Sequence, residues 1–361
     1  MAENEGPIRF GIMGCAEIAR KVSRAILLSP NAALVAVASR TIDKAKQFAL
    51  GNKLPESVKL YGSYGELLDD PLVDAVYMPL PTTLHSKWAV MAAQKGKHLL
   101  LEKPTALDVK VLDEMLQSCE TNGVQFMDGS MWYHHPRTAK MKDLLSNSHV
   151  FGPLKAIHSS SSYHPPPDFL ENNVRVKAEL DGLGALGDAG WYCIGAILWS
   201  MNRKLPTTVT ALPTAVRNSA GVILSCSASM IWDEDETVAT FFCSFLAHET
   251  MSLAVCASNG TLNVDDLIIP YEETAAGFSY TSGAKFVDLH IGWNVKPQHV
   301  QVETKLPQEA LMIQEFSRLV KDVKYHGGRP DTSWAETSRS TQLVLDAVKN
   351  SIDDGYKAVK M

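Results

Sequence analysis

The stretch Ile8-Arg9-Phe10-Gly11-Ile12-Met13-Gly14-Cys15-Ala16-Glu17-Ile18-Ala19 decides the fold of the first part of this chain. It begins with a short apolar run, which predicts a buried strand over Ile8–Met13. An amphipathic pattern follows directly and predicts a helix over Glu17–Leu28. A strand that turns sharply into a helix is typical of an α/β protein with a parallel sheet.

The turn between this strand and helix carries small residues where a dinucleotide-binding fingerprint needs them. Gly14, Ala16 and Ala19 hold the three glycine positions. These positions allow a tight turn, a close approach of backbone to a pyrophosphate, and close packing of helix on strand. Alanine at the second position departs from the usual glycine. The cofactor contacts predicted in this segment are Gly11, Gly14, Ala16, Glu17 and Ile18. A tight turn in another kind of α/β protein is the alternative.

The next hundred residues continue the alternation of apolar runs and amphipathic patterns. The predicted strands are Ala33–Ser39, Asp74–Met78, His98–Leu101 and Val124–Met127, and the predicted helices are Lys44–Leu50, Leu84–Lys95 and Asp108–Asn122. Repeated strand–helix units of this kind favour a doubly wound parallel sheet, the Rossmann class, ending near Asp128.

After Asp128 the pattern changes to longer strands separated by turn residues. We predict helices over Thr138–Leu145, Asp188–Trp199, Pro307–Lys324 and Ser333–Asp353, and strands over Leu154–Tyr163, Thr207–Val216, Ile223–Trp232, Thr237–Phe245, Met251–Ala257 and Thr261–Val264. Consecutive alternating strands indicate an open, mostly antiparallel sheet in a second α/β domain.

Composition limits the kind of partner this chain can have. The 361 residues are 45% hydrophobic and 20% charged, and the net charge is -6, so we expect a globular protein that does not bind nucleic acid. The sequence has no apolar run of spanning length and no signal-like N-terminus. The six cysteines are scattered without ligand-like spacing. We therefore expect a cytoplasmic protein with reduced cysteines, no metal and no membrane contact.

The second predicted strand ends at Ser39-Arg40, and this dipeptide bears on the type of cofactor. An NAD site places a carboxylate there to bind the ribose 2′-hydroxyl, and none is present. A serine hydroxyl and a guanidinium suit a 2′-phosphate instead. We therefore predict NADP, with NAD possible. A surface arginine on a solvated loop is the alternative.

Two further loops follow strands of the parallel sheet, where ligands bind in such folds. In the first, the residues predicted to line the cofactor are Leu80, Pro81, Thr82 and His85, although a rigid loop and helix cap would explain them equally. In the second, Glu102-Lys103-Pro104, we predict that Glu102 and Lys103 contact the cofactor. The ammonium group of Lys103 can also bind a substrate oxygen and stabilise developing negative charge. A surface Glu–Lys pair is the alternative there.

The segment Gly182-Leu183-Gly184-Ala185-Leu186-Gly187-Asp188-Ala189-Gly190-Trp191-Tyr192 is the third candidate. Asp188 and Tyr192 lie four residues apart, which predicts that they share one helix face. A carboxylate and a phenol there suit acid–base chemistry or substrate binding. An N-cap aspartate with a packed tyrosine is the alternative.

Together these motifs resemble the glucose–fructose oxidoreductase / inositol dehydrogenase (Gfo/Idh/MocA) family. The nearest branch in motif contains dimeric dihydrodiol dehydrogenases and xylose dehydrogenases. The resemblance implies a Rossmann domain over 1–128, a substrate and dimerisation domain over 129–330, and a C-terminal helix over 331–361 that returns to the Rossmann domain. It also implies a homodimer formed through the C-terminal sheet.

The same resemblance implies roles for individual residues. Lys103 matches the catalytic lysine, and Asp188 matches the aspartate of the family's glycine-rich segment. Tyr192 stands where many members have histidine, so either Tyr192 or Lys103 exchanges the proton. Arg175 matches an arginine near the nicotinamide. The substrate-lining candidates are Trp132, His134 and His135.

The resulting prediction is an NADP-dependent oxidoreductase for a CH–OH carbon of a sugar, polyol or diol-like small molecule. Two alternatives stay open. One is an oxidoreductase of trans-dihydrodiols or dicarbonyls, and the other is a non-catalytic dinucleotide-binding sensor.

Overall fold

The computed structural model describes residues 5–287 and 292–361. The chain folds as two compact units. Unit 1 comprises Met1–His134 and Leu306–Arg339, and unit 2 comprises His135–Lys305 and Ser340–Met361. No helix among the described residues is both long enough and apolar enough to cross a membrane.

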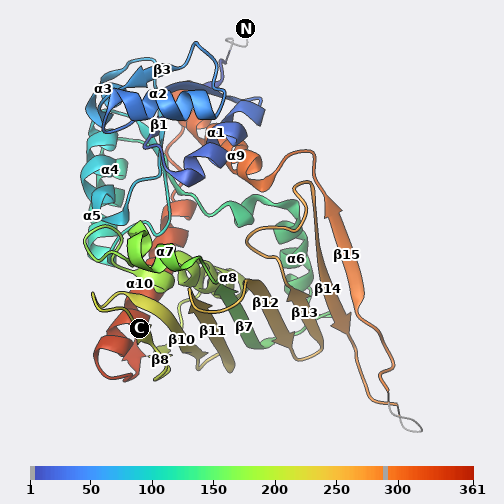
Figure 1. The fold of residues 1–361 in the computed structure, drawn as a ribbon. Helices are drawn as coiled ribbons and strands as arrows, with labels where there is room; N and C mark the ends of the chain where they lie inside the picture. The colour runs from blue at the N-terminus through green and yellow to red at the C-terminus, as the bar shows by residue number, and fades with distance from the viewer. Residues whose placement is uncertain (1–4, 288–291) are drawn as a thin grey trace. The chain divides into compact units, whose positions relative to one another are not determined.

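Unit 1 is built on a parallel sheet whose described strands follow the order β3-β2-β1-β4-β5-β6. Figure 1 labels β1 and β3 of this sheet together with the helices of the same unit. The strands are β1 (Ile8–Met13), β2 (Ala32–Ala38), β3 (Lys59–Tyr61), β4 (Ala75–Met78), β5 (His98–Leu101) and β6 (Phe126–Asp128). The order reverses between β1 and β4, and in such sheets ligands bind beyond the carboxyl ends of the strands at that reversal. The predicted Rossmann class is confirmed.

Helices cover both faces of this sheet. They are α1 (Glu17–Leu28), α2 (Ile42–Gly51), α3 (Tyr64–Asp69), α4 (His85–Gln94), α5 (Val109–Thr121) and α9 (Gln308–His326). Phe10 of β1 packs on Phe316 of α9, with 5.8 Å between ring centroids, whereas the next residue, Gly11, faces Leu67 of α3. Successive residues of a strand point to opposite faces, so β1 is covered on both sides.

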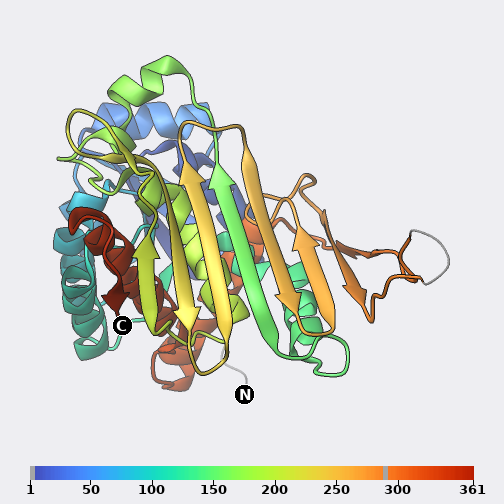
Figure 2. The same ribbon diagram turned by 90° about the horizontal axis from the view of Figure 1, so that it is seen from below.

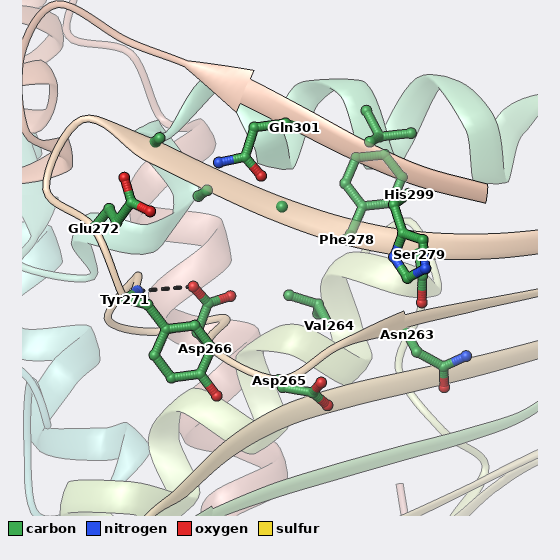
Figure 3. A pocket seen from close by; sticks show the side chains of 14 residues that line it. Asn263, Val264, Asp265, Asp266, Tyr271, Glu272, Phe278, Ser279, His299 and Gln301 are labelled. Atoms are coloured by element: carbon green, nitrogen blue, oxygen red, sulfur yellow. Dashed lines mark hydrogen bonds between the residues drawn. The ribbon is translucent and has the colours of Figure 1, made fainter. Parts of the chain in front are cut away.

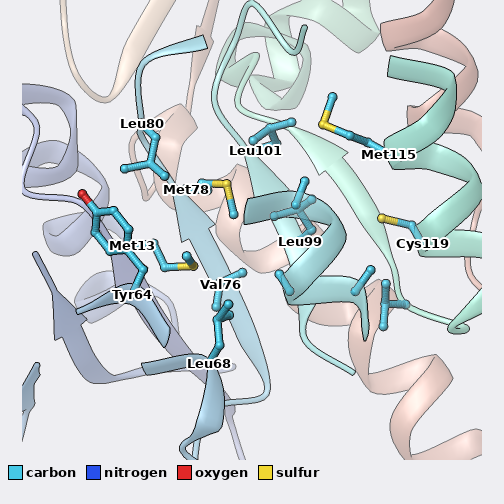
Figure 4. Packing of buried hydrophobic residues seen from close by; sticks show 14 of the residues in the cluster. Met13, Tyr64, Leu68, Val76, Met78, Leu80, Leu99, Leu101, Met115 and Cys119 are labelled. Carbon is cyan, nitrogen blue, oxygen red and sulfur yellow. The ribbon is translucent and has the colours of Figure 1, made fainter. Parts of the chain in front are cut away.

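The core on one side of the sheet explains why its strands read as continuous apolar runs. Figure 4 shows Met13, Val76 and Leu99 from the strands in one buried cluster with Met115 and Cys119 of α5. A strand buried on both faces carries apolar residues at successive positions, so its sequence does not alternate between apolar and polar residues.

Two elements of unit 1 were not predicted from the sequence, β3 and α3. Three residues of strand are too few to show a period. The start of α3 does carry a readable signal, because Ser63 and Glu66 form a capping box in which each side chain binds the other's backbone N–H.

Unit 2 is built on a larger sheet. Its described strands follow the order β15-β14-β13-β12-β7-β11-β10-β8-β16, and β9 also pairs with β10. The strands are β7 (Leu154–Ser162), β8 (Thr208–Ala211), β9 (Val216–Arg217), β10 (Ile223–Trp232), β11 (Thr237–Ser244), β12 (Thr250–Ala257), β13 (Gly260–Val264), β14 (Ala275–Ser282), β15 (Gln298–Glu303) and β16 (Val359–Lys360). Strands β7 and β11 are parallel and the other strand pairs of this sheet are antiparallel, which confirms the predicted mostly antiparallel sheet.

One expected strand of unit 2 was wrong. Thr207–Val216 was predicted as continuous, but the structure has β8 and β9 with a turn between them. Pro213 stands in that turn, and proline cannot donate to a strand ladder because it has no backbone N–H. Strands β14 and β15 were not predicted, since small and polar residues dominate them.

The helices of unit 2 lie on one side of its sheet, as Figure 2 shows. They are α6 (Pro136–Ser146), α7 (Pro167–Asn172), α8 (Trp191–Ser200) and the second part of α10 (Ser333–Asp353). The opposite face of the sheet is open over its central strands. On that face Ile231 lies opposite Val238, and Val238 lies opposite Ala156. Ala156 in turn lies opposite Cys256, so an apolar row crosses β10, β11, β7 and β12.

The last helix, α10, belongs to both units. Its first part lies in unit 1, where Ser338 donates a hydrogen bond to Asp128. The remainder lies in unit 2 and leads to β16, which pairs with β8 at the edge of the large sheet.

Candidate active site

The glycine-rich loop of unit 1 forms a tight turn against the loop that follows β4. Gly14 has φ +121°, a conformation that favours glycine, and its N–H donates to the Ala38 carbonyl at 2.9 Å. A Cβ at Gly14 would lie 2.9 Å from Cδ2 of Leu80. Two segments predicted to bind the cofactor therefore meet at the carboxyl edge of the sheet.

The start of α1 is suited to an anion. Ala16 is the N-cap residue, and among the described side chains none caps this end of the helix. The N–H groups of an uncapped first turn, together with the helix dipole, attract a phosphate. The side chain of Glu17 is exposed and pairs with Arg20 at 2.8 Å, so the expected contacts of Glu17 and Ile18 come from backbone. Gly11 lies inside β1, where a side chain would collide with Leu67.

Positive charge gathers at the end of β2. Ser39 is buried and hydrogen-bonds the thiol of Cys15, while Arg40 is exposed. Burial raises the pKa of Cys15, and the Ser39 bond and the charge of Lys44 lower it. Lys44, in the first turn of α2, was not predicted as a site residue. A hydroxyl and two cations at this edge fit a 2′-phosphate.

The ring of His85 connects the loop that follows β4 to the loop that follows β5. Its Nδ1 lies 3.0 Å from the Thr105 carbonyl oxygen and its Nε2 lies 2.9 Å from that of Leu80. The ring is buried, and burial lowers the pKa of His85, while its hydrogen bonds to backbone carbonyls act in the opposite direction. Pro81 and the buried Thr82 begin the short 3-10 turn between these loops. His85 therefore supports the loop that follows β4 and connects it to the loop that follows β5.

Lys103 follows β5 at the same edge of the sheet, and the Lys103–Pro104 peptide bond is cis. The preceding side chain, Glu102, turns into the protein, where the hydroxyl of Tyr77 donates to it at 2.5 Å. Tyr77 was not among the predicted residues. The carboxylate of Glu102 is thus engaged with the protein interior beside Lys103.

In unit 2, Asp188 is held by two side chains. Oδ1 of Asp188 lies 3.0 Å from Nε of Arg175, and Oδ2 accepts a hydrogen bond from the Tyr163 hydroxyl at 2.8 Å. The charge of Asp188 raises the pKa of Arg175, and burial together with Asp188 raises that of Tyr163. Tyr163, at the end of β7, is a further residue that the sequence did not reveal.

The segment that carries Asp188 also differs in local structure from the expected helix start. Leu186–Gly190 form a π-helical turn, and Gly190 precedes α8 as its N-cap residue. Asp188 is therefore not the N-cap of α8, which removes that alternative. Tyr192 is half-buried in the first turn of α8.

The three predicted substrate-lining residues lie in packed surroundings. Trp132 is buried and stacks on Tyr133, and His134 stacks on Trp334 with 4.7 Å between ring centroids. Nδ1 of His135 accepts the Arg137 N–H and caps α6. Burial lowers the pKa of both histidines to about 4. Stacking and helix capping account for these positions structurally, and their role in lining a substrate stays a prediction.

The predicted residues thus form two groups. One group lies at the carboxyl edge of the parallel sheet in unit 1 and includes Lys103, while Arg175, Asp188 and Tyr192 lie in unit 2. Among the described residues, no cluster of three or more His, Cys, Asp or Glu side chains is arranged to hold a metal ion.

A separate hollow of about 290 Å³ lies beside β13, β14 and β15 of unit 2. Figure 3 shows Asp265, Glu272, His299 and Gln301 around it, with the Tyr271 N–H bound to Asp266. None of the predicted site residues lines this hollow.

Comparison with known proteins identifies the family. Residues 8–130 match the family described as "Oxidoreductase family, NAD-binding Rossmann fold", and residues 138–263 match the GFO/IDH/MocA C-terminal domain. The chain belongs to the Gfo/Idh/MocA family. The resemblance deduced from the motifs is confirmed, and with it, at the level of the family, the class of NAD(P)-dependent oxidoreductase.

Several relatives of this Gfo/Idh/MocA protein carry functional names. D-xylose 1-dehydrogenase (NADP(+)) 2 of Haloferax volcanii is 30% identical over 96% of this chain and 98% of its own length. A dTDP-3,4-didehydro-2,6-dideoxy-alpha-D-glucose 3-reductase of Actinomadura kijaniata is 36% identical over 54% of this chain and 56% of its own length. The match thus spans only about half of that reductase.

A solved structure extends the comparison to the whole fold. A 3-ketoreductase from Actinomadura kijaniata, in complex with NADP and TDP-benzene, superposes with a TM-score of 0.81. It is 25% identical, and the match covers 96% of this chain and 98% of that one. The fold class is confirmed over both units, and NADP is the cofactor held by this relative.

Proposed function

We propose that this protein is an NADP-dependent oxidoreductase that acts on a CH–OH carbon of a sugar, polyol or diol-like molecule. The observation that carries the proposal is the carboxyl edge of the parallel sheet. There the tight Gly14 turn and the uncapped start of α1 form a pyrophosphate cradle, and Lys103 follows a strand of the same edge. A binding cradle beside a reactive cation suits catalysis better than sensing, because a sensor has no chemical need of the lysine.

The chain's own residues bind, orient and exchange a proton in this proposal. The nicotinamide, when bound, supplies or accepts the hydride at its C4. Nζ of Lys103 binds the reacting oxygen and stabilises negative charge on it. Tyr192 or Lys103 exchanges the proton of that oxygen. Asp188, with both oxygens engaged, orients Arg175 and Tyr163.

The substrate class rests on the relatives. The xylose dehydrogenase and the nucleotide-sugar reductase both carry names of enzymes that act on sugars. A trans-1,2-dihydrobenzene-1,2-diol dehydrogenase of Xenopus tropicalis is 28% identical over 71% of this chain and 74% of its own length. This relative supports trans-dihydrodiols as the second candidate class.

Binding and turnover of separate variants test the proposal. We expect Arg40→Asp to weaken NADPH binding by at least about tenfold while leaving NADH binding nearly unchanged, because a carboxylate repels the 2′-phosphate. We expect Lys103→Met to abolish turnover of sugars and diols, followed at the NADPH absorbance band, while NADPH still binds. Equal losses for the two cofactors in Arg40→Asp would remove the 2′-phosphate site. NADPH binding without turnover of any sugar, polyol, diol or dicarbonyl by the wild-type protein would favour the sensor.

We propose further that the protein forms a homodimer through the open face of the unit 2 sheet. The support is the apolar row of Ile231, Val238, Ala156 and Cys256, which crosses four strands on the face opposite the helices. A cytoplasmic location, expected from the sequence, belongs to the same proposal.

A further inference from the structure

Tyr77 lies in the middle of β4, at the centre of the parallel sheet, and it is 0% exposed. Tyr77 lies opposite Leu100 in the register of β4 and β5. Glu102 follows Leu100 by two residues, which places its side chain on the same face of the sheet. The Tyr77 hydroxyl reaches along this face and donates to Oε1 of Glu102 at 2.5 Å. A polar pair of this kind inside a sheet core needs an explanation, because a phenylalanine would fill the space without any desolvated hydroxyl.

The carboxylate of Glu102 connects this pair to Lys103. Its Oε2 accepts the backbone N–H of Lys103 at 3.2 Å. The backbone of Glu102 is itself fixed, since its N–H donates to the Met78 carbonyl at 3.2 Å. The space for the carboxylate comes from Gly129, where a Cβ would lie 2.8 Å from Oε1. Each of these contacts lies within unit 1.

Among the described residues, Tyr77, Lys103 and Asp128 are the ionisable groups that act on the pKa of Glu102. Burial raises the pKa of Glu102, and the Tyr77 hydrogen bond and the charge of Lys103 lower it, while the charge of Asp128 on β6 raises it. Asp128 is also buried, and burial raises its own pKa. Tyr77 is the neutral donor in this group, so its hydroxyl stabilises the ionised form of Glu102 without adding charge.

We propose that Tyr77 is a positioning residue for Lys103, acting through Glu102, for the reaction proposed above. The Tyr77 hydroxyl holds the Glu102 carboxylate in the space beside Gly129. That carboxylate in turn binds the backbone N–H of Lys103. The same carboxylate, when ionised, attracts the Lys103 ammonium group and so limits where it can reach. Tyr77 itself touches neither cofactor nor substrate in this proposal.

The variant Tyr77→Phe tests the proposal, with Tyr61→Phe as its matched control. Phenylalanine keeps the ring and removes the hydroxyl. Tyr61 also donates to a carboxylate, that of Asp70 at 2.7 Å, but it lies on β3, and three strands separate β3 from β5 in the order of the sheet. We expect Tyr77→Phe to lower kcat/KM by about tenfold, with little change in the Kd for NADPH. We expect Tyr61→Phe to leave both unchanged.

The pH profile separates positioning from a purely structural effect. Without the hydroxyl Glu102 takes up its proton at higher pH, so the acid limb of kcat/KM in Tyr77→Phe should move up by about one pH unit. In a Glu102→Gln background this titration is gone, and adding Tyr77→Phe should produce no further shift. An unchanged acid limb in folded Tyr77→Phe would overturn the proposal.

A second readout works without any substrate. The rate at which acetic anhydride acetylates Lys103 at pH 8, followed by peptide mass spectrometry, reports the surroundings of its amine. We expect this rate to change by about threefold or more in Tyr77→Phe and to stay constant in Tyr61→Phe. If the wild-type protein turns over no substrate, the proposed function fails, and the acetylation rate still decides the role of Tyr77. Equal rates in the wild type and Tyr77→Phe would overturn it.

Discussion

His98 shows how strongly burial acts on a single residue. It begins β5 with 8% of its surface exposed, and its Nδ1 accepts the Gln125 N–H at 2.9 Å. Burial lowers the pKa of His98 to about 4. The neutral ring is an obligatory part of the fold, because a protonated Nδ1 has no lone pair with which to accept that bond.

This lowered pKa predicts a loss of stability in acid. Below about pH 6.5 the unfolded chain takes up a proton at His98 that the folded chain does not. The contribution of the neutral ring is therefore fully present above pH 6.5 and is lost as the pH falls towards 4, by about 3 kcal/mol in total. In His98→Asn the amide oxygen keeps an acceptor for Gln125 and removes the titration. We expect its free energy of unfolding, from urea melts, to fall less steeply between pH 6.5 and 4.

The exposed His149, which lies outside the apolar row, is the control for this experiment. Exchanging it for asparagine in His149→Asn should leave the slope of the unfolding free energy against pH as it is in the wild type. A slope for His98→Asn that equals that of the wild type would show that other groups dominate acid unfolding.

At the scale of elements, Arg137 fixes α6 to the strands beside it. Its guanidinium is 1% exposed and pairs with Asp266, and it also donates to the carbonyls of Gly277 at 3.0 Å and Leu267 at 3.2 Å. One side chain thus joins α6 to β14 and to the loop after β13. A buried pair of this kind is costly to break, since the remaining charge is left without a partner.

We expect Arg137→Met to lower the free energy of unfolding by about 3–5 kcal/mol, measured by urea denaturation. The physical reason is the carboxylate of Asp266, which stays buried after its cation is removed. Adding Asp266→Asn should recover part of the loss. The exposed pair of Arg217 and Asp353 supplies the control, because Arg217→Met should cost only about 0–1 kcal/mol. Similar losses in the two single variants would contradict this account.

Hydrophobic periodicity predicted long and amphipathic elements more accurately than short or mostly polar ones. The bounds of β1, α1 and α10 agree with the expected ones. The three residues of β3 gave no period, and β14, with its small and polar residues, gave no alternation. The carboxyl edge of the parallel sheet was predictable for a different reason. Parallel strands all end at the same edge, so residues that follow several strands lie together without any knowledge of side chains.

The hydroxyl–carboxylate pairs could not be predicted in this way. Tyr77 and Glu102 are separated by 25 residues, as are Tyr163 and Asp188. No local pattern links residues at that distance, because the contact depends on which strands become neighbours. From the sequence alone, a tyrosine in an apolar strand is interpreted as a core residue. Its hydrogen-bonding role becomes apparent only when the structure shows which carboxylate its hydroxyl contacts.

At the scale of the whole molecule, the open face of the unit 2 sheet sets the expected assembly. Val238 is 43% exposed and Ile231 is 40% exposed, and they lie opposite each other on β11 and β10. Single exposed apolar residues are common on protein surfaces, but a row of them across adjacent strands marks an interaction site. A second copy of the chain supplies the same row, and a two-fold axis allows the two rows to cover each other.

We therefore expect a dimer that depends on this row. Val238→Lys places a charge at the centre of the row, where association would bury it without a partner. Light scattering after gel filtration should give twice the chain mass of 39.5 kDa for the wild type and the mass of one chain for Val238→Lys. Leu50→Lys, at an 83% exposed position of α2, is the matched control and should remain a dimer.

A dimer that survives Val238→Lys would place the interface elsewhere. A monomeric wild type would show that the row stays exposed to solvent. In that case we expect Val238→Lys to have the same free energy of unfolding as the wild type in urea melts, because an exposed lysine at this position costs the fold little.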